Sequence, residues 1–137
     1  MPTCLAYAAA FSLCLISQAT AGEWLTVGLT RLPMDGGERI VGIHIEITAG
    51  IIHAMNGLPR GWRITIDNKA DGSASVLGGA EVGAAALDAD QLIKFLRIEK
   101  DESLGEKFEI SGQLDVTRDF VDVRTLPLRL DNFAVAP

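Results

Sequence analysis

Two histidines and one methionine are the residues of this chain whose types and spacing could bind a metal. His44 and His53 lie on either side of Thr48-Ala49, and if the chain reverses there they become opposite neighbours on two paired strands. Cross-strand neighbours have Cβ atoms about 5 Å apart, close enough for two imidazoles to share one ion. Met55 comes two residues after His53, which places both on the same face of a regular strand. Imidazole and thioether groups are ligands that copper(I) accepts.

The His53-x-Met55 pair resembles the copper-binding element of small periplasmic copper chaperones, which are cysteine-free β-sandwiches. The resemblance implies a metal carrier that holds copper through His44, His53 and Met55. Those chaperones use further Met and His ligands at set distances, and here only Met34 remains, without that spacing. The alternative is that both imidazoles are ordinary strand residues and that Met55 fills the core. The usual behaviour of these residue types favours the alternative.

Residue patterns typical of enzymes are missing from the sequence. It has no G-x-S-x-G nucleophile elbow, no H-E-x-x-H zinc helix, no Walker loop and no G-x-G-x-x-G fingerprint. A carboxylate pair for glycoside hydrolysis could be drawn from Asp115, Asp119 and Asp122. With 18 acidic residues such pairs arise by chance, and a solvated face explains them better. We therefore expect neither catalysis nor a resident cofactor.

Residues 1–21 have the features of a secretory signal peptide. They carry no charged side chain, and their apolar run from Cys4 to Ile16 is shorter than the about 20 residues that a membrane span needs. Ala19-Thr20-Ala21 gives the small-x-small pattern of a cleavage site, so we expect cleavage between Ala21 and Gly22 rather than a buried helix or a membrane anchor. The mature domain, residues 22–137, would then act in the periplasm, at the cell surface or in the medium.

The positions of the cysteines indicate the compartment, and the net charge narrows the class of partner. Cys4 and Cys14 both lie in the leader, so the mature chain forms no disulfide, which fits a bacterial periplasm or surface better than a eukaryotic secreted module. All 12 basic and 18 acidic residues belong to the mature part, which keeps the net charge of −6. Nucleic acid and anionic membranes require a basic face, so neither is an expected partner. We also expect no transmembrane segment in the mature chain.

The elements that must position these residues are β-strands. Residues 43–48 and 62–67 alternate apolar and polar side chains, and this period of two predicts two half-buried strands. Many short runs of this kind, with turn residues between them, predict a single antiparallel β-sandwich of about seven to nine strands, with an open barrel as the alternative. Further extended runs are expected at residues 22–31, 51–55, 75–87, 107–116 and 120–135.

Three connections determine how these strands are arranged. Residues 32–37 and 101–105 have the composition of hairpin turns, so we expect each to join two strands that pair with each other. Residues 88–96 fit either a short helix, capped by Asp88 and Gln91, or a strand that continues into Ile98.

These patterns predict a non-catalytic module that binds a protein or glycan outside the cytoplasm, with the copper carrier as the alternative. The segment Leu126–Val135 is apolar and contains Pro127, which cannot donate to a ladder, so we expect it at a sheet edge. There it would either recruit a partner strand or block one. Trp24 could be exposed for stacking on a sugar, whereas Trp62 shares the parity of the expected core residues.

Overall fold

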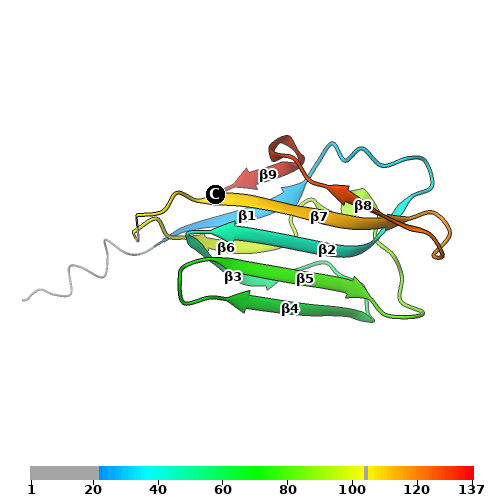
Figure 1. The fold of residues 1–137 in the computed structure, drawn as a ribbon, viewed down its shortest axis with the longest axis horizontal. Coiled ribbons are helices and arrows are strands. Elements are labelled where there is room, and N and C mark those ends of the chain that lie inside the picture. The colour runs from blue at the N-terminus through cyan, green and yellow to red at the C-terminus, as the bar shows by residue number, and fades with distance from the viewer. Residues whose placement is uncertain (1–21, 104) are drawn as a thin grey trace, which may run out of the picture.

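The computed structural model describes residues 22–103 and 105–137, which form two antiparallel β-sheets packed face to face (Figure 1). The four-stranded sheet has the order β3-β6-β1-β9, and the five-stranded sheet has the order β4-β5-β2-β7-β8. The expected antiparallel β-sandwich is therefore confirmed. The expected signal peptide, residues 1–21 with Ala21 at its cleavage site, lies outside the described residues.

The described residues contain nine strands and two 3₁₀ turns. The strands are β1 (Glu23–Leu29), β2 (Arg39–Thr48), β3 (Gly50–Met55), β4 (Trp62–Asn68), β5 (Ala74–Ala80), β6 (Leu96–Lys100), β7 (Glu109–Thr117), β8 (Val123–Pro127) and β9 (Phe133–Ala136). The 3₁₀ turns are η1 (Ala89–Leu92) and η2 (Leu130–Asn132). In this part of the chain, no helix has the length and apolar character needed to cross a membrane.

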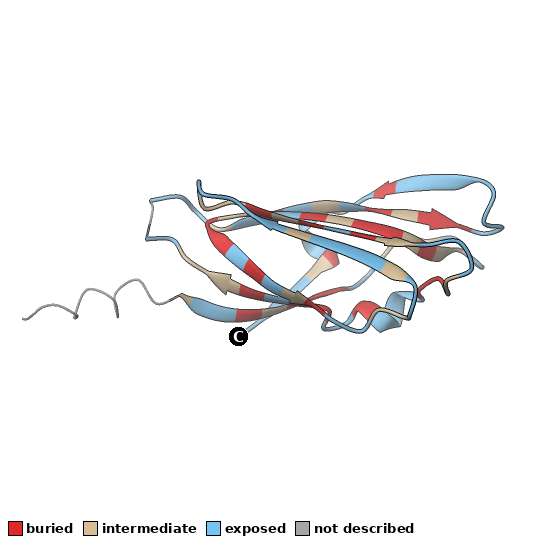
Figure 2. Cartoon of the chain, turned by 90° about the horizontal axis from the view of Figure 1, so that it is seen from below, coloured by how far each residue is buried: buried red, intermediate tan, exposed pale blue. Residues whose placement is uncertain are grey.

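Alternating burial along the strands explains why the two sheets pack together. On β2, Ile43, Ile45 and Ile47 are buried between the layers, while His44 and Glu46 lie on the outer face. Figure 2 shows the same alternation of buried and exposed segments along other strands. The buried residues of the opposite sheet include Leu25, Val27, Ile52, Leu96 and Ile98. Burial of such side chains contributes about 25 cal/mol for each Å² of apolar surface removed from water.

The pairing of the strands differs from the expected hairpins. β1 pairs with β6 and β9, not with β2, and β7 pairs with β2 and β8, not with β6. The connections from β1 to β2 and from β6 to β7 therefore join strands of different sheets. A period of two predicts which face of a strand is buried, but it does not predict which strand lies beside it. Both expected hairpins were wrong for this reason.

The segment 88–96 forms a short 3₁₀ turn and then enters a strand. Gln91 Oε1 accepts a hydrogen bond from the Asp88 backbone N–H at 2.7 Å, which is the expected capping contact. The helical part ends at Leu92, and the chain enters β6 at Leu96. A Cβ added to Gly28 would lie 1.6 Å from the carbonyl oxygen of Ile93. Glycine on β1 is thus needed for the close approach of this segment.

The C-terminal segment occupies an edge of each sheet, as expected. β8 is the edge strand of the five-stranded sheet and β9 is the edge strand of the four-stranded sheet. Pro127 lies at the end of β8, opposite Gln113. Leu128 packs against the core, whereas Leu130 is 78% exposed. Leu130 can therefore be changed without disturbing the core, but Leu128 cannot.

We predict that Ile45→Asp lowers the free energy of unfolding by at least about 3 kcal/mol, because it places an unpaired carboxylate between the sheets. Ile45 is fully buried, whereas Leu77 on the outer face of β5 is 51% exposed. The control Leu77→Asp should therefore change stability by less than about 1 kcal/mol. Urea denaturation of the two variants tests the assignment of the faces, and equal effects would contradict it.

Candidate functional site

The structure does not bring His44 and His53 together. His44 lies on the central strand β2, opposite Leu77 of β5 and Gln113 of β7. His53 lies on β3, which belongs to the other sheet and pairs only with β6 among the described strands. The chain does not reverse within one sheet at Ala49; this residue has a left-handed backbone (φ 53°) and the chain crosses between the layers there. The expected cross-strand pair of histidines is therefore wrong.

Met55 faces the core and not the side of His53. The register of β3 against β6 shifts between Ile52 and Ala54, which marks a β-bulge. A bulge adds one residue to the strand and reverses the alternation beyond it. Consequently the His53 side chain is 38% exposed, while Met55 is buried and its Cε would lie 3.4 Å from a Cβ built on Gly78. This packing agrees with the alternative interpretation, in which Met55 fills the core.

Each histidine instead has a carboxylate neighbour on its own outer face. His44 Nε2 lies 3.0 Å from Glu46 Oε2, and His53 Nε2 lies 3.0 Å from Glu99 Oε1. Across residues 22–103 and 105–137, no three His, Cys, Asp or Glu side chains are grouped so that they could hold a metal ion. The copper hypothesis thus lacks an assembled set of ligands in this part of the chain.

Trp24 is exposed, but its own neighbours contact its ring. The ring centroid lies 4.5 Å from that of His53, and the guanidinium carbon of Arg97 lies 4.6 Å from the Trp24 centroid. Trp24 is 42% exposed on the outer face of the four-stranded sheet. A sugar that stacks on this ring would have to displace or share these contacts. The contacts of Trp24 with His53 and Arg97 therefore weaken the case for a glycan-binding surface at this ring.

Four exposed apolar side chains lie close together at one end of the sandwich. We call Val82, Phe120, Val121 and Val123 the apolar loop face. Val82 is fully exposed and Phe120 is 59% exposed. Behind them is a hollow of about 480 Å³ that Val82, Phe120 and Val123 line together with Val41. Exposed apolar side chains that lie next to one another often mark a site of interaction with another molecule.

The β7–β8 loop holds Phe120 in a conformation that side chains rarely adopt. Phe120 has φ 64°, in the left-handed region. Its backbone N–H donates to Thr117 Oγ1 at 3.0 Å, and Asp119 Oδ1 accepts from the backbone N–H groups of Val121 and Asp122, both at 2.9 Å. These bonds, that of Asp122 first, lower the pKa of Asp119. The Asp119 carboxylate is therefore used to shape the turn that exposes Phe120.

Two arginines tie the neighbouring loop, residues 30–38, to the same hairpin. Arg124 donates from Nε and Nη2 to the two carboxylate oxygens of Glu38, at 3.0 and 2.7 Å, and Arg118 Nε donates to the carbonyl of Gly36 at 3.1 Å. The Glu38 side chain is only 8% exposed. Hydrogen bonds from Arg124, and then from the Asp35 N–H, lower the pKa of Glu38 from 4.5 to about 2. A charged and fixed rim thus borders the apolar loop face.

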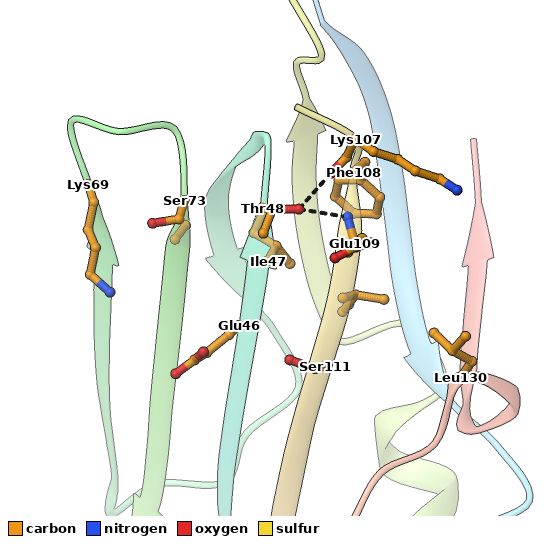
Figure 3. A pocket seen from close by; sticks show the side chains of 12 residues that line it. Glu46, Ile47, Thr48, Lys69, Ser73, Lys107, Phe108, Glu109, Ser111 and Leu130 are labelled. Atoms are coloured by element: carbon orange, nitrogen blue, oxygen red, sulfur yellow. Dashed lines mark hydrogen bonds between the residues drawn. The ribbon is translucent and has the colours of Figure 1, made fainter. Parts of the chain in front are cut away.

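A second hollow, of about 470 Å³, lies beside the far ends of β2 and β7 (Figure 3). There Thr48 Oγ1 donates to the Lys107 carbonyl at 2.7 Å and accepts from the Glu109 N–H at 2.9 Å. Five apolar residues line the hollow along with seven polar or charged ones. The apolar ones are Ile47, Ala74, Phe108, Ile110 and Leu130.

The sequence did not reveal the apolar loop face. Residues 120–123 were expected to be part of a strand because they are apolar, but β7 ends at Thr117 and β8 begins at Val123. One signal was available, since Phe120 and Val121 are adjacent apolar residues directly after Arg118-Asp119. Adjacent apolar residues cannot both point to one core face of a regular strand. The pattern therefore already conflicted with a regular half-buried strand.

Comparisons with known proteins offer no precedent for either hollow. The chain matches no protein-family description, no curated protein and no solved structure. Its function is therefore inferred from the chemistry of its described surface.

We predict that Glu38→Gln destabilises the protein at neutral pH and that this effect disappears in acid. The folded pKa of about 2 lies below the ordinary 4.5, so the stability that the carboxylate contributes is complete above pH 4.5 and is lost as the pH falls toward 2. Urea denaturation of parent and variant across this range measures the difference.

The matched control is Glu81→Gln. Glu81 also pairs with an arginine, but Arg63 is 78% exposed and Glu81 is 51% exposed, so solvent screens their attraction. We expect a smaller stability change from this variant. A loss at Glu38→Gln that is the same at every pH would contradict the role of the Glu38 charge.

Proposed function

We propose that residues 22–137 form a non-catalytic binding module that acts outside the cytoplasm and holds a protein partner through the apolar loop face. The observation that carries this proposal is the exposure of Val82, Phe120, Val121 and Val123 at one end of the sandwich. Burial of such side chains would contribute about 25 cal/mol of favourable free energy for each Å² of apolar surface removed from water. A partner that covers them would recover that free energy.

The surroundings of the apolar loop face support a protein as its partner. Specific protein interfaces combine an apolar centre with a polar rim. Here the rim contains Arg118, Glu38 and Arg124, whose charges are already paired or hydrogen-bonded within the chain. The net charge of −6 disfavours an anionic membrane as the alternative occupant of this face.

The rigidity of the loops further supports a binding role. Asp119 accepts two backbone hydrogen bonds in the turn. Glu38 fixes the adjacent loop because its carboxylate accepts a bidentate pair of hydrogen bonds from Arg124. A surface that is ordered before binding loses less conformational entropy when the partner arrives. The left-handed Phe120 fits this view, because backbone strain is retained most often where function requires it.

Two further observations weigh against catalysis and against a glycan. Asp119 serves the turn, and Asp115 accepts a hydrogen bond from Thr125 Oγ1 at 3.3 Å, so two of the three carboxylates considered for hydrolysis have structural partners. Arg97 and His53 contact the Trp24 ring that a sugar would use. The extracytoplasmic location is proposed from the sequence features of residues 1–21 and from the absence of cysteine after Cys14.

Phe120→Asn should reduce recovery of the partner at least about tenfold, a loss of about 1.4 kcal/mol or more, while leaving the melting temperature nearly unchanged. Asn accepts the left-handed backbone readily, so the variant removes the ring and keeps the turn. The measurement is affinity purification of the tagged protein from its host, with co-purified proteins quantified by mass spectrometry. Leu77→Asn, exposed on another face, is the control and should retain the partner. Full recovery with Phe120→Asn would refute this binding face.

Protein recovered from the host should begin at Gly22 and be found outside the cytoplasm. The physical basis is the uncharged, short apolar leader with Ala19-Thr20-Ala21 at its end. N-terminal sequencing of protein from separated cell fractions measures both features. Intact Met1 on protein from the cytosol would contradict the proposed location.

A further inference from the structure

The two open sides of the sandwich differ in how the backbone groups of their edge strands are covered. On one side, the Asn68 side chain joins β4 to the edge strand β3. Its Oδ1 accepts from the Ile52 N–H at 2.9 Å and its Nδ2 donates to the Ile52 carbonyl at 3.0 Å. The amide group of Asn68 thus occupies the place that a neighbouring strand would take. At Ile52 the edge of β3 is therefore guarded against strand addition.

On the other side, the edge of β7 is only half covered. β8 pairs with β7 from Gln113 to Thr117, and the last bond between the two segments runs from the Leu128 N–H to the Gly112 carbonyl at 2.9 Å. The chain then turns away into η2. For the part of β7 from Glu109 to Gly112, β2 is the only strand partner among the described strands.

The alternation of antiparallel bonding identifies which groups are left uncovered. The Gly112 carbonyl points away from β2, since it accepts from Leu128, so Ile110, two residues earlier, points its N–H and carbonyl the same way. Beyond it, the Phe108 N–H donates to Glu102 Oε2 at 3.1 Å. No backbone or side-chain partner is found for the Ile110 groups within the described ranges. The same alternation points the Phe108 carbonyl and the Gly112 N–H to this side, and neither has a partner among the described residues. The gap therefore runs from the Phe108 carbonyl to the Gly112 N–H, with both backbone groups of Ile110 at its centre.

The second hollow lies directly beside this gap. Phe108, Ile110 and Leu130 all line it, and Figure 3 shows Leu130 on a different segment from the β7 residues, with the ribbon of β1 seen between them. Leu130 is 78% exposed although it is a large apolar residue. Backbone groups without a partner, next to a hollow with apolar side chains on its wall, form the combination that binds extended peptides, because the backbone supplies hydrogen bonds and the hollow accepts a side chain.

The charges around the hollow indicate what kind of peptide fits. Lys69 and Lys107 contribute two ammonium groups, while Glu46 and Glu109 contribute two carboxylates. Equal numbers of opposite charges give no preference for a strongly charged segment. A segment with small apolar and hydroxyl side chains meets these conditions best.

We propose that the Ile110 edge and the hollow beside it form a second binding site, for an uncharged extended peptide of a partner protein. The peptide lies antiparallel to β7, in line with β8, exchanges two backbone hydrogen bonds with Ile110, and places one apolar side chain between Phe108 and Leu130. β8 already occupies the adjoining half of this edge in that orientation. The site is separate from the apolar loop face, so the two proposals can fail independently.

Amide hydrogen exchange, followed by nuclear magnetic resonance on isotope-labelled protein, tests the site. In the free protein the Ile110 amide should exchange at least about tenfold faster than the Ser111 amide, because Ser111 bonds to β2. The probe is the capped peptide Val-Thr-Val-Thr-Val at millimolar concentration, whose central valine faces the hollow when it pairs with Ile110. It should slow exchange at Ile110 at least about tenfold, and Val-Thr-Pro-Thr-Val should not, because proline removes the central donor.

Two variants separate the hollow from a general surface effect. Leu130→Lys should weaken binding of the Val-Thr peptide at least about tenfold, while Leu77→Lys should leave it unchanged. Phe120→Asn should also leave it unchanged, since the apolar loop face is not used. The proposal is overturned if the Ile110 amide is protected in the free protein, or if neither peptide slows its exchange. It is also overturned if both peptides protect it equally, or if its protection rises with protein concentration, which would identify a second copy as the occupant.

Discussion

The burial of one face of β2 against the four-stranded sheet is the constraint on which the rest of the structure depends. This strand is central in the five-stranded sheet, and Ile43, Ile45 and Ile47 meet the apolar inner face of the four-stranded sheet. Their contacts fix which face of every neighbouring strand turns inward. His44 and Glu46 are forced outward by the same alternation. The position of each candidate ligand on the surface therefore follows from the packing of the core.

The chain repeatedly crosses between the sheets, and these crossings decide where edges and loops are found. β1, β3 and β6 each precede a strand of the other sheet, so sequence neighbours rarely become partners in a ladder. The strands at the ends of the two sheet orders leave edges that have to be covered or used. Asn68 covers one such edge, and Glu102 and Leu128 limit the exposed part of another. What remains at Ile110 is small and well defined.

The two ends of the sandwich have different physical character. At the end with the apolar loop face, charged groups are paired and hydrogen-bonded, so the exposed apolar side chains are presented on a fixed frame. At the other end, Thr48 ties β2 to the start of β7, and the adjacent hollow has mixed polarity. A module with both features could contact a folded surface with one end and an extended segment with the other.

The sequence by itself determined the fold class, the buried faces of β2 and β7 and the edge position of Leu126–Val135. These depend on local alternation and on the missing N–H of Pro127, which act over a few residues. The expected core face of residues 62–67 was wrong in part, because Ile64 on β4 is 39% exposed. Only the tertiary structure decided that His44 and His53 lie in different sheets and that a bulge turns Met55 into the core. It also decided that Phe120 stands exposed on a left-handed turn. The reason is that strand partners, crossings and bulges are selected by the packing of the whole core, and alternation along one strand carries no information about them.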